Sequence, residues 1–181
     1  MKKYLLSVCL FCYCCCQRLA AQDCYSIQFS ALDGTTINTQ SSMNKRLIVV
    51  AFDAAHPIRA QLEALDSLYR NSNNGIMVIG IPVNDFSPAP SAVSLIGLLG
   101  DSLKVSFPIA AISKGTAGSG QHPLIRWLTT VSPKNHFNVS YSTSGQIFVV
   151  APNGLLYAVL DPQTPIGGHD MQHVLSNWPS E

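Results

Sequence analysis

Cysteine is almost absent from this chain once its first 16 residues are set aside. Five of the six cysteines lie between Cys9 and Cys16, and the remaining one is Cys24. A single cysteine cannot form an internal disulfide, a CxxC redox pair or a thiolate zinc cluster, so all three are excluded for the rest of the chain. We expect Cys24 to be a thiol at a mobile terminus, with an intermolecular disulfide as the alternative.

The chain also has little charge of either sign, and it contains no basic run. Charged residues make up 12% of the sequence, and basic residues do not alternate with aromatic ones. Both features argue against a nucleic acid as the partner. The partner predicted from the sequence is therefore a small molecule or a protein.

The longest apolar run stands at the N-terminus, and it is too short to cross a bilayer. It follows Lys2 and Lys3, extends from Tyr4 to Cys16, and is followed by small residues around Ala20 and Ala21. This order is typical of a secretory signal, whereas a membrane anchor would need about 18 apolar residues. We predict a signal peptide at residues 1–22, one domain at 23–181 with no membrane span, and a secreted or periplasmic location.

Two buried strands joined by a helix are predicted in the first half of that domain. The runs 47–52 and 76–81 are continuously apolar, as in strands covered on both faces of a parallel sheet. Between them, Ile58, Leu62, Leu65 and Tyr69 recur at helical spacing, with Pro57 at the first helical position. The segment therefore predicts a parallel β-α-β unit.

Turn signals and shorter periodic segments complete the predicted order of elements. Asp-Gly at 33–34 and Asn-Gly at 153–154 each predict a β-hairpin. Helices are expected at 91–99, 124–130 and 169–178, and an extended segment at 105–109. This order predicts an α/β protein with a thioredoxin-like three-layer fold, in which helices flank a mixed central sheet whose last two strands are antiparallel.

Several short segments resemble motifs of the glutathione peroxidases. They occur in the family's order, between about residue 26 and residue 160, and cover most of the domain. The matching segments are Gln61 with Leu65, Leu68 and Tyr69; Ile81-Pro82-Val83-Asn84-Asp85-Phe86; Val105-Ser106-Phe107-Pro108; Gln121-His122-Pro123-Leu124-Ile125-Arg126-Trp127-Leu128-Thr129; and Phe137-Asn138-Val139.

The resemblance implies a peroxidase site in which three of four positions have changed. The family reduces hydroperoxides with a cysteine or selenocysteine surrounded by Gln, Trp and Asn. Here His56, within one residue either way, takes the place of the nucleophile, Asp85 that of Gln and Phe137 that of Trp. Asn138 alone matches, and Val83 stands where the family often has a second cysteine.

These changes act against peroxide chemistry. A thiolate is needed to attack the O–O bond and to carry the oxygen as a sulfenic acid, which imidazole cannot do. Asp85 would disfavour a neighbouring thiolate, and Phe137 lacks the indole N–H. We therefore predict a non-catalytic binding or interaction module; the alternative is a thiol peroxidase or oxidoreductase of the oxidative-stress response that uses Cys24 or an unrecognised site.

Histidines offer the remaining candidate sites. His56 is either an exposed residue without a role or one half of a His56–Asp85 pair that binds a small polar ligand. His169 and His173 share a helix face and could form a weak metal site, although two histidines alone favour solvated surface. His122 is expected to cap a helix, and Trp127 and Leu128 are expected in the core. No cofactor is implied.

Overall fold

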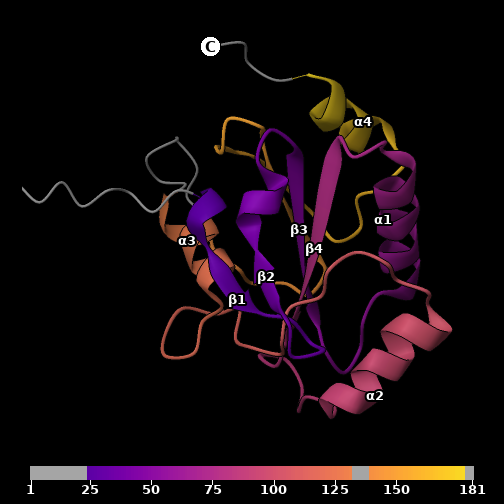
Figure 1. The fold of residues 1–181 in the computed structure, drawn as a ribbon, viewed down its shortest axis with the longest axis vertical. Helices are drawn as coiled ribbons and strands as arrows, with labels where there is room; N and C mark the ends of the chain where they lie inside the picture. The colour runs from indigo at the N-terminus through magenta and orange to yellow at the C-terminus, as the bar shows by residue number, and fades with distance from the viewer. Residues whose placement is uncertain (1–23, 132–138, 178–181) are drawn as a thin grey trace, which may run out of the picture.

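The computed structural model describes residues 24–131 and 139–177, which form a mixed sheet with helices on both faces (Figure 1). The order of the strands in the four-stranded sheet is β4-β3-β5-β6. The predicted signal peptide at residues 1–22 lies outside the described residues, and so do Phe137 and Asn138. Among the described residues, no helix is both long and apolar enough to cross a membrane.

The predicted β-α-β unit is confirmed. Strand β3 (Arg46–Asp53) pairs in parallel with β4 (Ile76–Val83), and both are buried along nearly their whole length. Helix α1 (Arg59–Asn71) connects them and buries Leu62 and Leu65. The helix begins at Arg59, two residues later than predicted from Pro57, because Ile58 adopts an extended conformation as its N-cap.

The second half of the sheet is antiparallel, as the Asn-Gly turn predicted. Strand β5 (Gln146–Val150) pairs antiparallel with β3, and β6 (Leu156–Leu160) pairs antiparallel with β5. Gly154 has a φ of 83° in the turn between them, a conformation that favours glycine. A bulge between Val149 and Val150 interrupts the register of β5 with β6.

Two hydrophobic clusters, one on each face of the sheet, form the core. One face is covered by the hairpin of β1 (Gln28–Ser30) and β2 (Thr36–Asn38), with η1 (Cys24–Ser26), η2 (Thr39–Ser42) and α3 (Pro123–Val131). The other face is covered by α1, α2 (Ala92–Ile96), η3 (Gly97–Ser102) and α4 (His169–Ser176). The predicted helix at 91–99 thus continues as η3 to Ser102, beyond Gly100.

The expected extended segment at 105–109 lies beside the outer edge of β4. The Gly80 N–H donates to the Pro108 carbonyl at 2.9 Å, and the Ala110 N–H donates to the Gly80 carbonyl at 2.8 Å. A Cβ at position 80 would lie 2.6 Å from Ile109 Cδ1 and 3.1 Å from Phe107 Cε2, so any larger residue would have to displace these side chains. These bonds place the loops that follow residue 110 at the carboxyl end of β4.

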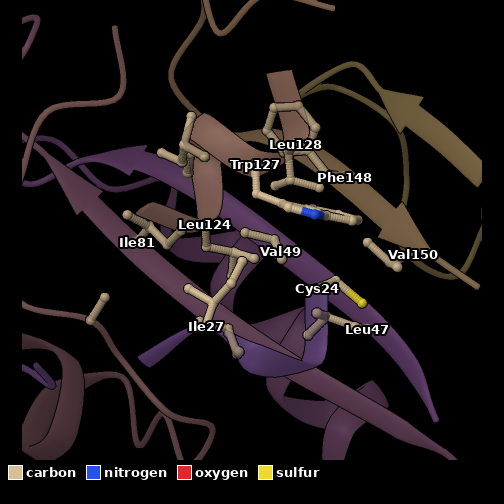
Figure 2. Close-up of a cluster of buried hydrophobic side chains, with 14 of the residues drawn as sticks. Cys24, Ile27, Leu47, Val49, Ile81, Leu124, Trp127, Leu128, Phe148 and Val150 are labelled. Carbon is tan, nitrogen blue, oxygen red and sulfur yellow. The ribbon is translucent and has the colours of Figure 1, made fainter. Parts of the chain in front are cut away.

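The prediction of a mobile Cys24 is wrong. Cys24 is fully buried, and Figure 2 shows its sulfur beside Leu47 and Val150 in the core. The adjoining Tyr25 hydroxyl donates to the Pro152 carbonyl at 2.7 Å. Burial of Cys24, Tyr25 and Ile27 fixes the segment, because their apolar surface is removed from water against the sheet.

Candidate functional site

The carboxyl ends of β3 and β4 lie side by side and carry a cluster of polar side chains. The Ala54 N–H donates to the Val83 carbonyl at 2.9 Å, which holds the two strand ends together. Asp53 is the last residue of β3, and His56 follows in the loop to α1. In open α/β sheets, ligands bind outside this end of the strands, so it is the candidate site.

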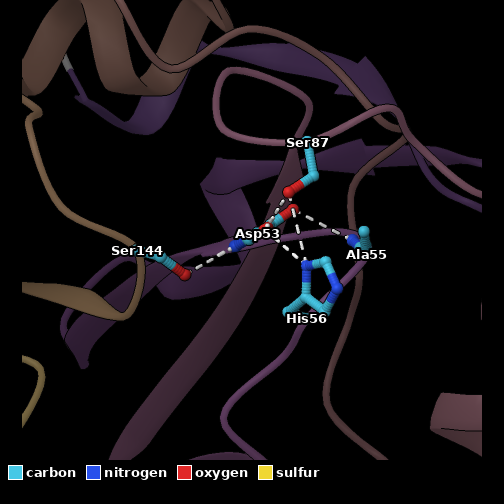
Figure 3. Close-up of polar contacts among 5 residues, drawn as sticks. All are labelled: Asp53, Ala55, His56, Ser87 and Ser144. Atoms are coloured by element: carbon cyan, nitrogen blue, oxygen red, sulfur yellow. Dashed lines mark hydrogen bonds and ion pairs between the residues drawn. The ribbon is translucent and has the colours of Figure 1, made fainter.

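Asp53 is the centre of the cluster (Figure 3). Its Oδ1 accepts a hydrogen bond from the Ala55 N–H at 3.0 Å. Its Oδ2 accepts one from Ser87 Oγ at 2.9 Å and lies 3.1 Å from His56 Nδ1. The Asp53 N–H donates to Ser144 Oγ at 2.8 Å, so residues from three separate loops meet here.

The electrostatics of the cluster keep Asp53 ionised. Burial by itself raises the pKa of Asp53, but hydrogen bonds from Ala55, His56 and Ser87 outweigh it and hold the pKa below its usual value. A buried carboxylate therefore stands at the tip of β3. It disfavours any second anion beside it.

The Asp53, His56 and Ser87 side chains do not form a nucleophilic triad. In such a triad the carboxylate binds one imidazole nitrogen and the serine hydroxyl binds the other. Here both Asp53 and Ser87 face Nδ1, with Ser87 Oγ at 3.3 Å, and the Ser87 proton goes to the carboxylate. The His56 side chain is 77% exposed, and its second nitrogen points away from Asp53 (Figure 3).

The His56–Asp85 pair, the alternative to an exposed His56 without a role, is not formed. Asp85 Oδ2 accepts a hydrogen bond from the Gly115 N–H at 2.6 Å, and Oδ1 accepts from the Thr116 N–H at 3.2 Å and from the Thr116 hydroxyl. Asp85 is drawn to this loop because the Val83–Ser113 bridge brings the loop to the end of β4. It anchors the loop, and Asp53 takes the place beside His56.

Tyr141 is a residue of this region that the sequence did not reveal. It is 6% exposed, and its hydroxyl has no hydrogen-bond partner among the described residues. Burial, followed by the negative charges of Asp85 and Asp53, raises its pKa. Its ring lies so close to Gly115 that a Cβ there would overlap with it. Tyr141 thus forms a wall of the cluster, and no motif surrounds it in the sequence.

Gln61 binds the backbone at the site's margin. Its Nε2 donates to the Gly145 carbonyl at 2.8 Å and to the Pro162 carbonyl at 3.1 Å. The side chain therefore fixes the start of β5 against α1. Phe137 and Asn138, the other two positions inferred from the family resemblance, lie outside the described residues.

The other histidines show no convergence toward a metal. The rings of His169 and His173 lie 6.2 Å apart on α4, and Asp170 Oδ1 is 3.6 Å from His169 Nδ1. No group of three or more possible metal ligands occurs within 24–131 and 139–177. His122 caps α3 as predicted, because its Nδ1 accepts from the Leu124 N–H at 3.2 Å.

Cys24 lies at the other end of the sheet from the candidate site. It contacts the start of β3, near Leu47, whereas Asp53 ends that strand. Six residues of strand span about 20 Å at roughly 3.3 Å each. A buried thiol at this distance cannot react with a substrate held beside Asp53 and His56.

Comparison with solved structures shows a shared fold at low sequence identity. The glutathione peroxidase Trgpx matches with a TM-score of 0.63 and 17% identity, over 87% of this chain and 99% of that one. GPX1 of T. cruzi matches with a TM-score of 0.65 and 18% identity, over 85% and 95%. No protein-family model and no curated protein sequence matches the chain.

Disulfide oxidoreductases also share the fold. A secreted Mycobacterium tuberculosis disulfide oxidoreductase, homologous to E. coli DsbE, matches with a TM-score of 0.53 and 11% identity, over 85% of this chain and 98% of that one. The thioredoxin-like fold predicted from the sequence is therefore confirmed, and it is shared with these glutathione peroxidase structures.

Proposed function

We propose that this protein is an exported, glutathione peroxidase-like protein without a peroxidatic thiol, and that it is a non-catalytic binding or interaction module. The observation that carries the proposal is the composition of the tip of β3. Asp53, His56 and Ser87 occupy it, and the one thiol in the described part of the chain is buried at the far end of the strand.

The charge at this tip supports the same conclusion. A peroxidatic thiol must lose its proton near neutral pH, which nearby positive charge favours and nearby negative charge opposes. Asp53 is a buried anion held by three hydrogen-bond donors. The site is thus suited to holding a cation or a hydrogen-bond donor, and unsuited to generating a thiolate.

Steady-state peroxide consumption tests the proposal. The protein lacking residues 1–22 is supplied with hydrogen peroxide and with either glutathione and its reductase or thioredoxin and its reductase. We expect no turnover above the rate without protein, and no change on Cys24→Ser. A glutathione peroxidase assayed in parallel is the positive control for the reducing systems.

Two results would overturn the proposal. Turnover that survives Cys24→Ser would reveal a catalytic site that does not use the thiol. Turnover that is abolished by Cys24→Ser would mean that the buried thiol becomes accessible. The protein would then be a thiol peroxidase or oxidoreductase that uses Cys24.

A further inference from the structure

We propose that the outer edge of β2 binds an extended segment of a partner protein, which adds as a strand to the β1–β2 hairpin. The segment would carry apolar residues at alternate positions and a lysine or arginine at one end. This surface lies away from the Asp53–His56 cluster, and the inference does not depend on whether that cluster binds a ligand.

The pairing of the hairpin leaves backbone groups of β2 directed outward. The Thr39 N–H donates to the Ile27 carbonyl and the Ala31 N–H to the Thr35 carbonyl, so the odd-numbered residues of β2 face β1. Thr36 and Asn38 consequently face away from β1. The Asn38 carbonyl accepts from Ser41 Oγ, whereas the Thr36 N–H, the Thr36 carbonyl and the Asn38 N–H have no partner among the described residues.

A groove of about 660 Å³ runs beside this edge. Thr36, Ile37 and Asn38 are among the residues that line it, so the residues with unpaired backbone groups belong to the wall of the groove. Much of the remaining lining is apolar, and it comes from the hairpin turn, α1, β4, α2, η3 and the segment at 105–109. The large apolar residues of this lining include Leu32, Tyr69, Met77, Ile96, Leu99 and Phe107.

An extended peptide fits both features at once. Strand addition satisfies the backbone donors and acceptor of the edge, and alternate side chains then enter the adjoining groove. A purely apolar small molecule would fill the groove but leave the edge unpaired. The volume lies within the range of about 300–1,000 Å³ that is usual for bound ligands.

Charge identifies one end of the segment. Among the described residues, Asp33 is the only charged one that lines the groove. Hydrogen bonds from the side chain and N–H of Thr35 hold the pKa of Asp33 below its usual value, so it is an anion at neutral pH. A basic residue at the end of the segment nearest the hairpin turn is therefore complementary.

The probe is the capped heptapeptide acetyl-Lys-Val-Thr-Val-Thr-Val-Lys-amide, whose two lysines allow either strand direction. Binding to the protein lacking residues 1–22 is measured by calorimetry, and amide exchange of Thr36 by NMR. We expect saturable 1:1 binding and slower exchange of the Thr36 N–H. Two further peptides carry an N-methyl group, one on the central Val and one on a neighbouring Thr.

The methylated peptides distinguish strand addition from apolar adsorption. Alternate residues of a strand face opposite edges, so methylation of one of the two residues should weaken binding at least tenfold and methylation of the other should leave it nearly unchanged. Equal affinity for all three peptides would overturn the proposal.

Gly100→Phe tests the groove. Gly100 lines the groove, and a Cβ there meets nothing within 4 Å, so a large side chain can be introduced at this point of the lining. Gly97→Phe is the matched control, because Gly97 belongs to the same helix but is not part of the lining. We expect Gly100→Phe to weaken binding at least tenfold and Gly97→Phe to leave it within about twofold.

The remaining variant and outcomes complete the test. Asp33→Asn keeps the oxygen that accepts from Thr35 but removes the charge, and should weaken binding and reduce its salt dependence.

No saturable binding of the heptapeptide, or undiminished binding to Gly100→Phe, would overturn the proposal. So would a dimer of the free protein that Gly100→Phe dissociates, since a second copy would then occupy the groove. None of these results bears on peroxide turnover, so the two proposals fail separately.

Discussion

His122 shows how one buried residue makes stability depend on pH. Its Nδ1 caps α3, Phe29 packs against its ring at 4.4 Å, and burial lowers its pKa from 6.5 to about 4. The unfolded chain therefore binds a proton between pH 6.5 and 4 that the folded protein does not. The stability that this neutral ring contributes is complete above pH 6.5 and is lost as the pH falls toward 4.

We predict that this single group accounts for a loss of up to about 3 kcal/mol in the free energy of unfolding over that interval. The measurement is urea denaturation at a series of pH values. His122→Asn retains a cap acceptor without titrating, and should remove most of the slope between pH 6.5 and 4. The exposed His173→Asn is the control, and an equal loss of slope in both variants would contradict the assignment.

The charge of Asp53 gives a second prediction at this scale. In a Cys24→Ser background, a thiol introduced by His56→Cys should have a pKa above its ordinary value of about 8.5, because the carboxylate beside position 56 disfavours a thiolate. The pH dependence of alkylation by iodoacetamide measures it. Adding Asp53→Asn should lower that pKa, and a thiol that ionises below pH 7 with Asp53 intact would contradict the prediction.

Single residues were also where the sequence was least informative. His122, Trp127 and Leu128 could be placed because they belong to a strongly periodic helix with a cap signal. The partner of His56 could not be predicted. In the sequence, Asp53 is simply the end of an apolar strand, and Asp85 is an equally plausible partner for the histidine. Only the loop that reaches Asp85 through Gly115 and Thr116 decides between them.

At the scale of elements, α1 is tied to the segment at 105–109 by a buried carboxylate. Asp66 Oδ1 accepts from the Ser106 N–H and from Ser106 Oγ, both at 2.7 Å, and Oδ2 lies 2.8 Å from Arg70 Nε. Asp66 is 1% exposed. This contact fixes a segment that has few regular hydrogen bonds and that borders both β4 and the groove.

We predict that Asp66→Ala lowers the free energy of unfolding by about 1–3 kcal/mol, because it removes a buried carboxylate that accepts two hydrogen bonds from Ser106. Chemical denaturation measures the loss. The exposed Glu63→Ala, three residues earlier on the same helix, should change stability by less than about 0.5 kcal/mol. A similar loss in both variants would contradict the role of this contact, because alanine is the strongest helix former and helix propensity cannot explain either loss.

Elements with strong periodic or turn signals were predictable, and their ends were less so. The apolar runs predicted β3 and β4, and the Asn153-Gly154 turn predicted the antiparallel pair of β5 and β6. The start of α1 and the extension of η3 depend on the conformation of Ile58 and on packing of Leu103, which local propensity does not report.

At the scale of the whole molecule, the sheet separates the thiol from the candidate site. The order β4-β3-β5-β6 buries β3 in the middle, with Asp53 at one end and Leu47, beside Cys24, at the other. The fold class was predictable because the β-α-β unit and the hairpin admit few arrangements. The burial of Cys24 was not, since a cysteine so near the predicted signal cleavage site gives no pattern of its own.

The oxidation of Cys24 by hydrogen peroxide tests most directly whether the folded molecule lacks a peroxidatic thiol. The protein lacking residues 1–22 is treated with peroxide, native or unfolded in urea, and sulfenic acid at Cys24 is trapped with dimedone and quantified by peptide mass spectrometry. Burial predicts that Cys24 in the native protein is oxidised far more slowly than in the unfolded chain. Faster oxidation in the native protein than in the unfolded chain would contradict it, because the fold would then be activating the thiol.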